Sequence, residues 1–153
     1  MYKVLFVCHG NICRSAMAEY VFKDYVKKHG YSELIHIESR ATSTEEIGNP
    51  VYPNVRRILD KEGIPCDGHQ AKRITYNDFN DFDIIIIFDD ENKYSLNRMF
   101  GESDKIVLFT KFSKNYYNEE IDDPWYTRNF DITYKMIVDS EVGLLEYIIK
   151  IIQ

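Results

Sequence analysis

The apolar run Ile84-Ile85-Ile86-Ile87-Phe88 constrains the fold of this 153-residue chain more than any other segment. Consecutive apolar residues, with no polar residue alternating between them, are typical of a strand that is buried on both faces in a parallel sheet. Parallel neighbours are joined by long crossover connections, which are usually helices. The rest of the chain should therefore supply further strands and the helices that cover both faces.

The predicted elements alternate between strand and helix along the whole chain. Further strands are expected at residues 2–7, 34–39 and 105–109, and helices at residues 16–28, 55–61, 89–99 and 130–152, with a single helical turn at 75–79. Residues 110–128 form a long polar loop, and loops of that length in compact domains are usually functional. We predict a doubly wound α/β fold with a four-stranded parallel sheet and helices on both faces, in a single domain over residues 1–153.

The segment Cys8-His9-Gly10-Asn11-Ile12-Cys13-Arg14-Ser15 follows the first strand and precedes a helix, for which Ser15 is the expected N-cap. Ligands of doubly wound folds bind beyond the carboxyl ends of the strands, where this loop falls. A thiolate is a nucleophile, and the planar fork of Arg14 matches phosphate oxygens. The loop N–H groups and the positive end of the helix also favour an anion, so Cys8 is predicted to attack a phosphate group that Arg14 binds.

The composition excludes several other classes of protein. The net charge is −6 and no basic stripe is present, so we expect no nucleic-acid partner. Three cysteines do not make a disulfide framework, and they indicate reduced thiols in a cytoplasmic protein. No apolar stretch is long enough to span a membrane, and no metal-ligand spacing is present, so neither a membrane partner nor a metal or other cofactor is expected.

A phosphoryl transfer from an oxygen leaving group needs a general acid, and the same group can then activate water. The best candidate is Asp123 in Asp122-Asp123-Pro124-Trp125-Tyr126, because Pro124 restricts the backbone that carries it. Trp125 and Tyr126 could line a pocket for an aryl group. Taken alone, this segment would also fit a surface turn with solvated carboxylates.

The loop at residues 8–15 closely resembles the phosphate loop of the low-molecular-weight protein tyrosine phosphatases. The resemblance covers essentially the whole chain, in the order that the family shows. Its further matches are Ser39, Thr42-Ser43, Ile47-Gly48-Asn49-Pro50, Gly63-Ile64, Gly68-His69, Ile74-Thr75, Asp78-Phe79, Phe82-Asp83, Asp89 and Asp123-Pro124.

This resemblance implies hydrolysis of phosphotyrosine and small aryl phosphates in two steps, through a phosphocysteine. Cys8 would be the nucleophile, Arg14 the phosphate clamp, Asp123 the general acid and Ser15 a donor to the sulfur. Asn11 would hold a positive φ, tethered by hydrogen bonds from Ser39 and His69. The backbone and side chains of the loop, including His9, Gly10, Ile12 and Cys13, would bind or support phosphate, sulfate or vanadate, and the protein would act as a monomer on phosphotyrosine proteins or peptides.

The chain departs from the family's usual pattern at four places. His9 stands where Leu is frequent, Ala16 replaces a Pro, Glu45 replaces an aromatic residue, and Thr127-Arg128 follows Tyr126 where a Gly is frequent. These changes leave the chemistry intact and bear on substrate preference. A substrate pocket built by His9, Glu45, Trp125 and Tyr126 would favour basic over acidic phosphopeptides.

Three rival functions share parts of the pattern. An arsenate reductase needs relay thiols, but Cys66 is the only cysteine outside the loop and is expected to be structural. A phosphocysteine carrier must hold its phosphate, which an arginine clamp and Asp123 would oppose. A phosphotyrosine-binding module without activity would not need the catalytic groups, yet this chain has every residue that the chemistry requires. Two modifications stay open: a reversible Cys8–Cys13 disulfide, as against a packing role for Cys13, and phosphorylation of Tyr126.

Overall fold

The computed structural model describes residues 1–153, and its centre is one parallel sheet. The strands are β1 (Tyr2–Cys8), β2 (Ile35–Ala41), β3 (Ile84–Ile87) and β4 (Ile106–Leu108), in the order β2-β1-β3-β4. All three strand pairs are parallel. The predicted α/β fold with four parallel strands is confirmed.

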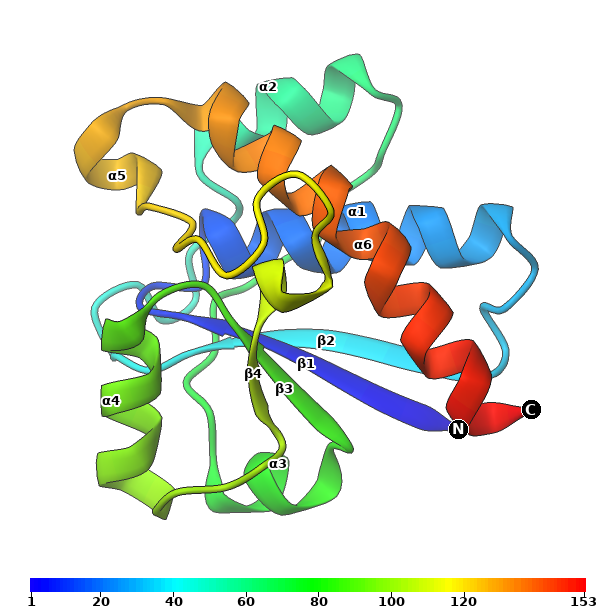
Figure 1. Ribbon diagram of the computed structural model, residues 1–153. Helices are drawn as coiled ribbons and strands as arrows, with labels where there is room; N and C mark the ends of the chain where they lie inside the picture. The colour runs from blue at the N-terminus through cyan, green and yellow to red at the C-terminus, as the bar shows by residue number, and fades with distance from the viewer.

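Helices cover both faces of this sheet (Figure 1). One face carries α1 (Arg14–Lys28), α2 (Pro53–Lys61) and α6 (Phe130–Ile152), and the other carries α3 (Tyr76–Asp81) and α4 (Asp90–Phe100). A 3-10 turn, η1 (Phe109–Phe112), and the short α5 (Pro124–Thr127) complete the chain. No helix combines the length and apolar character that a membrane crossing requires.

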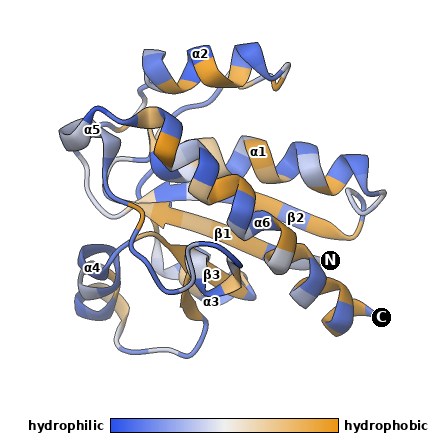
Figure 2. Cartoon of the chain, turned by 45° about the horizontal axis from the view of Figure 1, so that its top comes forward, coloured by the Kyte–Doolittle hydropathy of each residue, from blue (hydrophilic) through white to orange (hydrophobic).

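Each face of the sheet contributes to its own apolar core. Val4 and Phe6 of β1 belong to the larger core beneath α1 and α6, whereas Leu5 and Val7 belong to the smaller core beneath α3 and α4. Side chains alternate between the faces of a strand, so a strand covered on both sides is apolar throughout. Figure 2 shows this pattern as hydrophobic colour along β1, whereas the helices carry both hydrophobic and hydrophilic colour.

Two local predictions are wrong. The first helix begins at Arg14 with Cys13 as its N-cap, not at Ala16 with Ser15 as cap. The hydroxyl of Ser15 is instead occupied inside the loop, where it accepts a hydrogen bond from Asn11. The stretch 110–128 is not continuous loop, because the 3-10 turn and α5 interrupt it. Pro124 occupies the first turn of α5, where its missing N–H costs nothing.

The strand order decides where a ligand can bind. Because β1 lies between β2 and β3, the segments that follow these strands meet at one edge of the sheet. The loop after Cys8, the loop after Ala41 and the start of α4 therefore converge there. Figure 1 shows α5 approaching the same edge from the far end of the chain.

Candidate active site

The loop between β1 and α1 wraps around the sulfur of Cys8. The backbone amides of Asn11 and Ser15 lie 3.4 Å from Sγ, and Ser15 Oγ lies 3.0 Å from it. The amides of Gly10, Ile12 and Cys13 donate to no acceptor within the protein. The loop therefore surrounds the sulfur with N–H and O–H groups, several of which are free for an anion at the start of α1.

Asn11 organises the loop from behind. Its φ is +61°, a left-handed conformation that Asn tolerates better than most residues. Its Nδ2 donates to Ser15 Oγ and to Ser39 Oγ, each at 2.8 Å, and its Oδ1 accepts from the Lys72 amide at 3.2 Å. His69 Nε2 donates to the Asn11 carbonyl at 2.8 Å. The positive φ and both expected tethers, from Ser39 and His69, are present.

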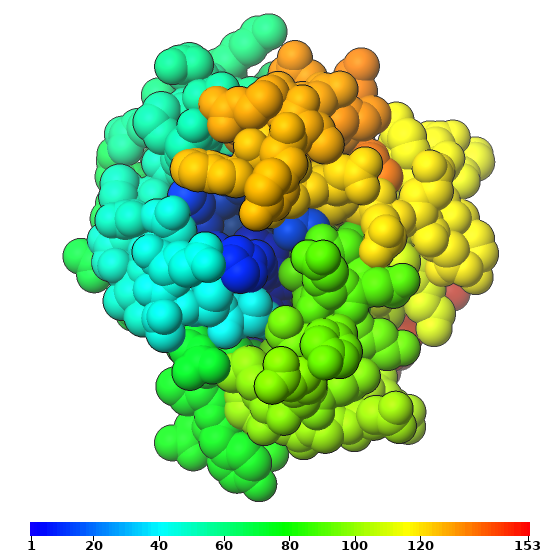
Figure 3. Space-filling model, turned by 90° about the vertical axis from the view of Figure 1, so that its left-hand side faces the viewer, coloured from blue at the N-terminus to red at the C-terminus, as the bar shows by residue number.

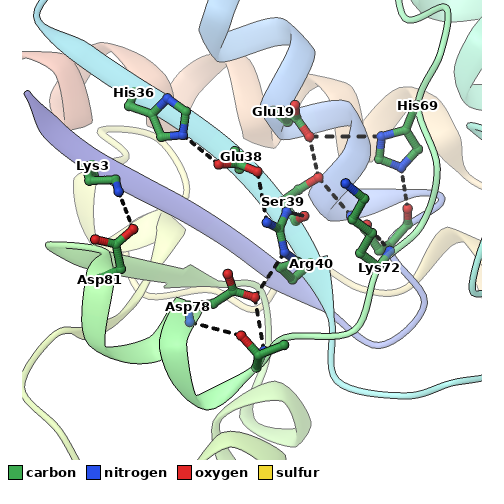
Figure 4. A network of polar contacts seen from close by, with 12 residues as sticks. Lys3, Glu19, His36, Glu38, Ser39, Arg40, His69, Lys72, Asp78 and Asp81 are labelled. Carbon is green, nitrogen blue, oxygen red and sulfur yellow. Dashed lines mark hydrogen bonds and ion pairs between the residues drawn. The ribbon is translucent and has the colours of Figure 1, made fainter.

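A second layer of buried groups supports these tethers. Ser39 donates a hydrogen bond to the carboxylate of Glu19, which also forms an ion pair with the ammonium of Lys23. Tyr20 Oη lies 2.9 Å from His69 Nδ1, and burial followed by the charge of Glu19 raises the pKa of Tyr20. Figure 4 shows Ser39 between Glu19 and the loop, with His69 and Lys72 beside it. The conformation of the loop at residues 8–15 is thus fixed by α1, β2 and the segment before α3.

Arg14 is almost fully buried, with 2% of its surface exposed, and is held by groups distant in sequence. Its Nη1 donates to Asp89 at 2.5 Å and to the Ile121 carbonyl at 2.9 Å. Burial by itself would lower the pKa of Arg14, but Cys8, Asp89 and Asp123 outweigh it and the pKa is raised. The buried Nε has no hydrogen-bond partner in the protein. A buried donor without a partner is costly, so a bound anion would satisfy it.

Asp123 faces the same guanidinium from α5. Its Oδ2 lies 3.6 Å from Arg14 Nη2, and its Oδ1 caps α5 by accepting from the Trp125 amide at 3.0 Å. The preceding Asp122 is exposed and does not line the pocket that contains Cys8. The cap and Pro124 therefore hold the Asp123 carboxylate beside Arg14 in the pocket that contains Cys8, whereas Asp122 lines only an adjoining pocket.

One pocket contains most of the predicted site. Its lining residues are Cys8, His9, Gly10, Ile12, Cys13, Arg14, Glu45, Glu46, Asp123, Trp125 and Tyr126. At its mouth, His9 Nε2 lies 3.0 Å from Glu45 Oε2. Figure 3 shows the N-terminal segment, in dark blue, at the bottom of a hollow between segments coloured cyan, green and orange. Asn11, Ser15, Ser39 and His69 do not line this pocket and lie behind it.

Three groups that shape the site were not predicted from the sequence to have a role in it. Asp89 and the Ile121 carbonyl hold Arg14, and Glu46 lines the pocket beside Glu45. Asp89 carries a usable signal, because it follows the most apolar strand of the sheet, whose carboxyl end adjoins that of β1. A backbone carbonyl such as that of Ile121 has no sequence signal.

The comparisons identify the family of this chain. A sequence model described as low molecular weight phosphotyrosine protein phosphatase matches residues 3–152. The chain belongs to this family. Within this phosphatase family, YfkJ of Bacillus subtilis, described as a low molecular weight protein-tyrosine-phosphatase, is 39% identical over 98% of this chain and 97% of its own length.

Solved structures of family members agree with this assignment. The crystal structure of YfkJ superposes with a TM-score of 0.96 at 38% identity, covering 100% of this chain and 98% of that chain. SP-PTP, a low molecular weight protein tyrosine phosphatase from Streptococcus pyogenes, gives a TM-score of 0.85 at 41% identity, covering 96% and 93%. The family resemblance expected from the sequence is confirmed.

Proposed function

We propose that this family member hydrolyses phosphotyrosine and small aryl phosphate monoesters through a phosphocysteine intermediate. The observation that carries the proposal is the meeting of Cys8, Arg14 and Asp123 in one pocket, at the carboxyl edge of the sheet. The unpartnered Nε of Arg14 and the free loop amides supply donors for the oxygens of a phosphate. Such fixed donors stabilise the charge that develops in phosphoryl transfer.

In the first step, the Cys8 thiolate attacks phosphorus and the bond to the phenolic oxygen breaks. Asp123 gives its proton to that oxygen, while Arg14 and the loop amides hold the three remaining oxygens. In the second step, Asp123 takes a proton from water, the water oxygen attacks phosphorus, and the bond to sulfur breaks. Ser15 Oγ, 3.0 Å from Sγ, stabilises the sulfur as it leaves as a thiolate. Inorganic phosphate is released and the starting state is restored.

Hydrolysis of p-nitrophenyl phosphate, with vanadate as inhibitor, tests the mechanism. Cys8→Ser should abolish turnover, and Asp123→Ala should lower kcat by roughly 10²–10⁴, the usual contribution of general acid catalysis. Asp122→Ala is the matched control, because it removes the neighbouring carboxylate, which does not line the pocket. Turnover in Cys8→Ser would overturn the mechanism, and a large loss in Asp122→Ala alone would reassign the acid.

Substrate selection is the finer part of the proposal. Glu45 and Glu46 line the pocket that holds the phosphate donors, and Trp125 and Tyr126 supply aromatic surface. Because Glu45 already pairs with His9, its carboxylate is held at the pocket mouth, where it would attract cationic side chains beside a phosphotyrosine. Basic phosphopeptides should therefore show a higher kcat/KM than acidic ones, and Glu45→Tyr should reduce the difference. Glu102→Gln, an exposed change outside the pocket, is the control, and equal selectivity in all three proteins would refute the idea.

Cys13 is proposed as the partner of Cys8 in a protective disulfide. Both thiols line the active-site pocket. Burial, followed by Cys8 and Asp123, raises the pKa of Cys13, so Cys13 rests as a protonated thiol. After peroxide converts Cys8 to a sulfenic acid, Cys13 would attack that sulfur, lose its proton and release water. A Cys13→Ser variant should then lose activity to peroxide in a form that thiols no longer restore, and full restoration would disprove the protective role.

The remaining assignments concern the whole protein. The pocket collects residues from Cys8 to Tyr126, which supports treating residues 1–153 as one catalytic domain. Because one chain supplies all the residues of this pocket, we expect the protein to act as a monomer. The three free thiols, including the buried Cys66, fit a reducing cytoplasmic location. Phosphate, sulfate or vanadate should occupy the loop in solution. Tyr126 is 79% exposed, so it is accessible to a kinase.

A further inference from the structure

A second cavity lies where α1, α6 and the residues after α2 meet, and it shares no lining residue with the active-site pocket. Val21 of α1, Ile64 after α2 and Val138 of α6 give it apolar walls. Tyr25 and Tyr134 add an aromatic ring from each of the two long helices. The cavity therefore combines apolar and aromatic walls with a polar surface of about the same extent.

Glu141 of α6 lines this cavity and has only 5% of its surface exposed. Its buried Oε1 has no hydrogen-bond partner. Buried carboxyl groups are normally hydrogen-bonded or paired with a charge, because an unpartnered buried polar group costs free energy. Oε1 is closed to solvent, so a cation in the cavity would provide the missing partner after a rotation of the Glu141 side chain that turns Oε1 into the cavity.

The other charged groups of the cavity are also mainly acidic. Asp24 and Lys28 of α1 form an ion pair with Oδ2 and Nζ 2.8 Å apart, so the one ammonium among the lining residues already has a partner. Glu62, which follows α2, adds a further carboxylate. With Glu141 ionised, the lining carries three carboxylates and one ammonium, which favours a cationic occupant.

The kind of cation follows from the spacing of these groups. Nowhere in the chain do three His, Cys, Asp or Glu side chains lie close enough together to hold a metal ion. A cation with an apolar body could instead fill the space between the aliphatic walls and place its charge at Glu141. Cations also bind favourably to the faces of aromatic rings, which Tyr25 and Tyr134 would supply.

We propose that the cavity between α1 and α6 is a second binding site, specific for small organic ammonium compounds whose apolar part packs against Val21, Ile64 and Val138 while the ammonium pairs with Glu141. This second site is independent of the proposed catalytic mechanism, because none of the catalytic residues lines the cavity. Benzylammonium is a suitable probe, since it combines one ammonium with one ring.

Proton linkage gives the proposal a distinctive signature. Burial, followed by the charge of Asp24, raises the pKa of Glu141 to about 9, with Lys28 opposing the shift. At pH 7 the carboxyl is therefore protonated in the free protein. Pairing with an ammonium requires the ionised form, so the carboxyl proton passes to the buffer when the ligand binds. Of the other titratable groups that line the cavity, Tyr25 and Tyr134 have raised pKa values as well and stay protonated at this pH.

The first experiment is a ¹H–¹⁵N and methyl NMR titration of the full chain at pH 7 with benzylammonium, benzyl alcohol and benzoate. We expect benzylammonium to shift the methyl resonances of Val21, Ile64 and Val138 and to bind at least about 10-fold more tightly than benzyl alcohol. Glu141→Gln should remove that preference, whereas Glu146→Gln, which removes an exposed charge from the same helix, should keep it. Activity towards p-nitrophenyl phosphate checks the folding of both variants.

The second experiment is calorimetry in two buffers with different ionisation enthalpies. The difference in observed heat should correspond to release of about one proton per benzylammonium bound to the wild type. Shifts confined to residues of the active-site pocket, equal affinity for benzylammonium and benzyl alcohol, or unchanged binding by Glu141→Gln would each overturn the proposal. Binding without proton release would overturn the assigned role of Glu141.

Discussion

Replacing Asn11 with alanine should lower the free energy of unfolding by more than is usual for a loop residue. Asn11 makes three side-chain hydrogen bonds, to Ser15, Ser39 and the Lys72 amide, and each is worth about 1 kcal/mol. The left-handed backbone adds about 1–2 kcal/mol for a residue with a Cβ that lacks local polar contacts. The expected loss is therefore about 4–5 kcal/mol, out of a total stability of roughly 5–15 kcal/mol.

The chain provides a matched control for the backbone part of this loss. Asn118 has a φ of +62°, but it is exposed and its side chain makes no hydrogen bond within the protein. Asn118→Ala should therefore cost only the left-handed strain, about 1–2 kcal/mol. The difference between the two variants, about 3 kcal/mol, measures the side-chain hydrogen bonds alone.

Urea denaturation followed by circular dichroism measures both free energies of unfolding, and thermal melts give a second estimate. A domain of this length loses roughly 2–4 °C per kcal/mol, so Asn11→Ala should melt roughly 8–20 °C below the wild type. It should also lower kcat with p-nitrophenyl phosphate, whereas Asn118→Ala should not. Equal destabilisation by the two substitutions would refute the argument, because it would mean that the buried hydrogen bonds add nothing.

Three further predictions concern two positions of α6 and the clamp residue Arg14. A Cβ on Gly143 would lie 2.1 Å from the Phe112 carbonyl oxygen, so Gly143→Ala should lower the free energy of unfolding, measured by urea denaturation, by about 1–3 kcal/mol. The control Val142→Ala, on the exposed face of the same helix, should change it by less than about 0.5 kcal/mol. Burial raises the pKa of Glu141 to about 9, so between about pH 4.5 and 9 the folded state holds a proton that the unfolded state releases. The free energy of unfolding of the wild type should therefore fall as the pH rises through this range. Glu141→Gln should flatten that slope in melts recorded at a series of pH values. Arg14→Lys keeps the charge but loses the fork that contacts Asp89 and, in the proposed mechanism, would bind the phosphate. Two lost charged hydrogen bonds of about 1.5–3 kcal/mol each predict a kcat/KM for p-nitrophenyl phosphate roughly 10²–10⁴ lower.

Much of the fold follows from local sequence patterns. The run at residues 84–88 and the alternation of strands with helices predict four parallel strands, and the structure has them in the order β2-β1-β3-β4. The last helix, predicted at residues 130–152, has those bounds, because a long periodic apolar stripe fixes a helix from within. The predicted start of the first helix is wrong, since the competing hydrogen bond that Asn11 donates to Ser15 depends on how the loop closes.

The grouping of the loop's functional residues is encoded locally: a thiol, an arginine and an Asn suited to positive φ lie within seven residues, so local chain geometry is enough to bring them together. Their surroundings depend on the tertiary structure. Arg14 is held by Asp89 and the Ile121 carbonyl, 75 and 107 positions away, and α5 turns Asp123 rather than Asp122 towards the pocket. The buried, unpartnered carboxyl of Glu141 likewise exists only because α1 packs against α6. Contacts of this kind depend on how helices pack on the sheet, and no local pattern of residues encodes that arrangement.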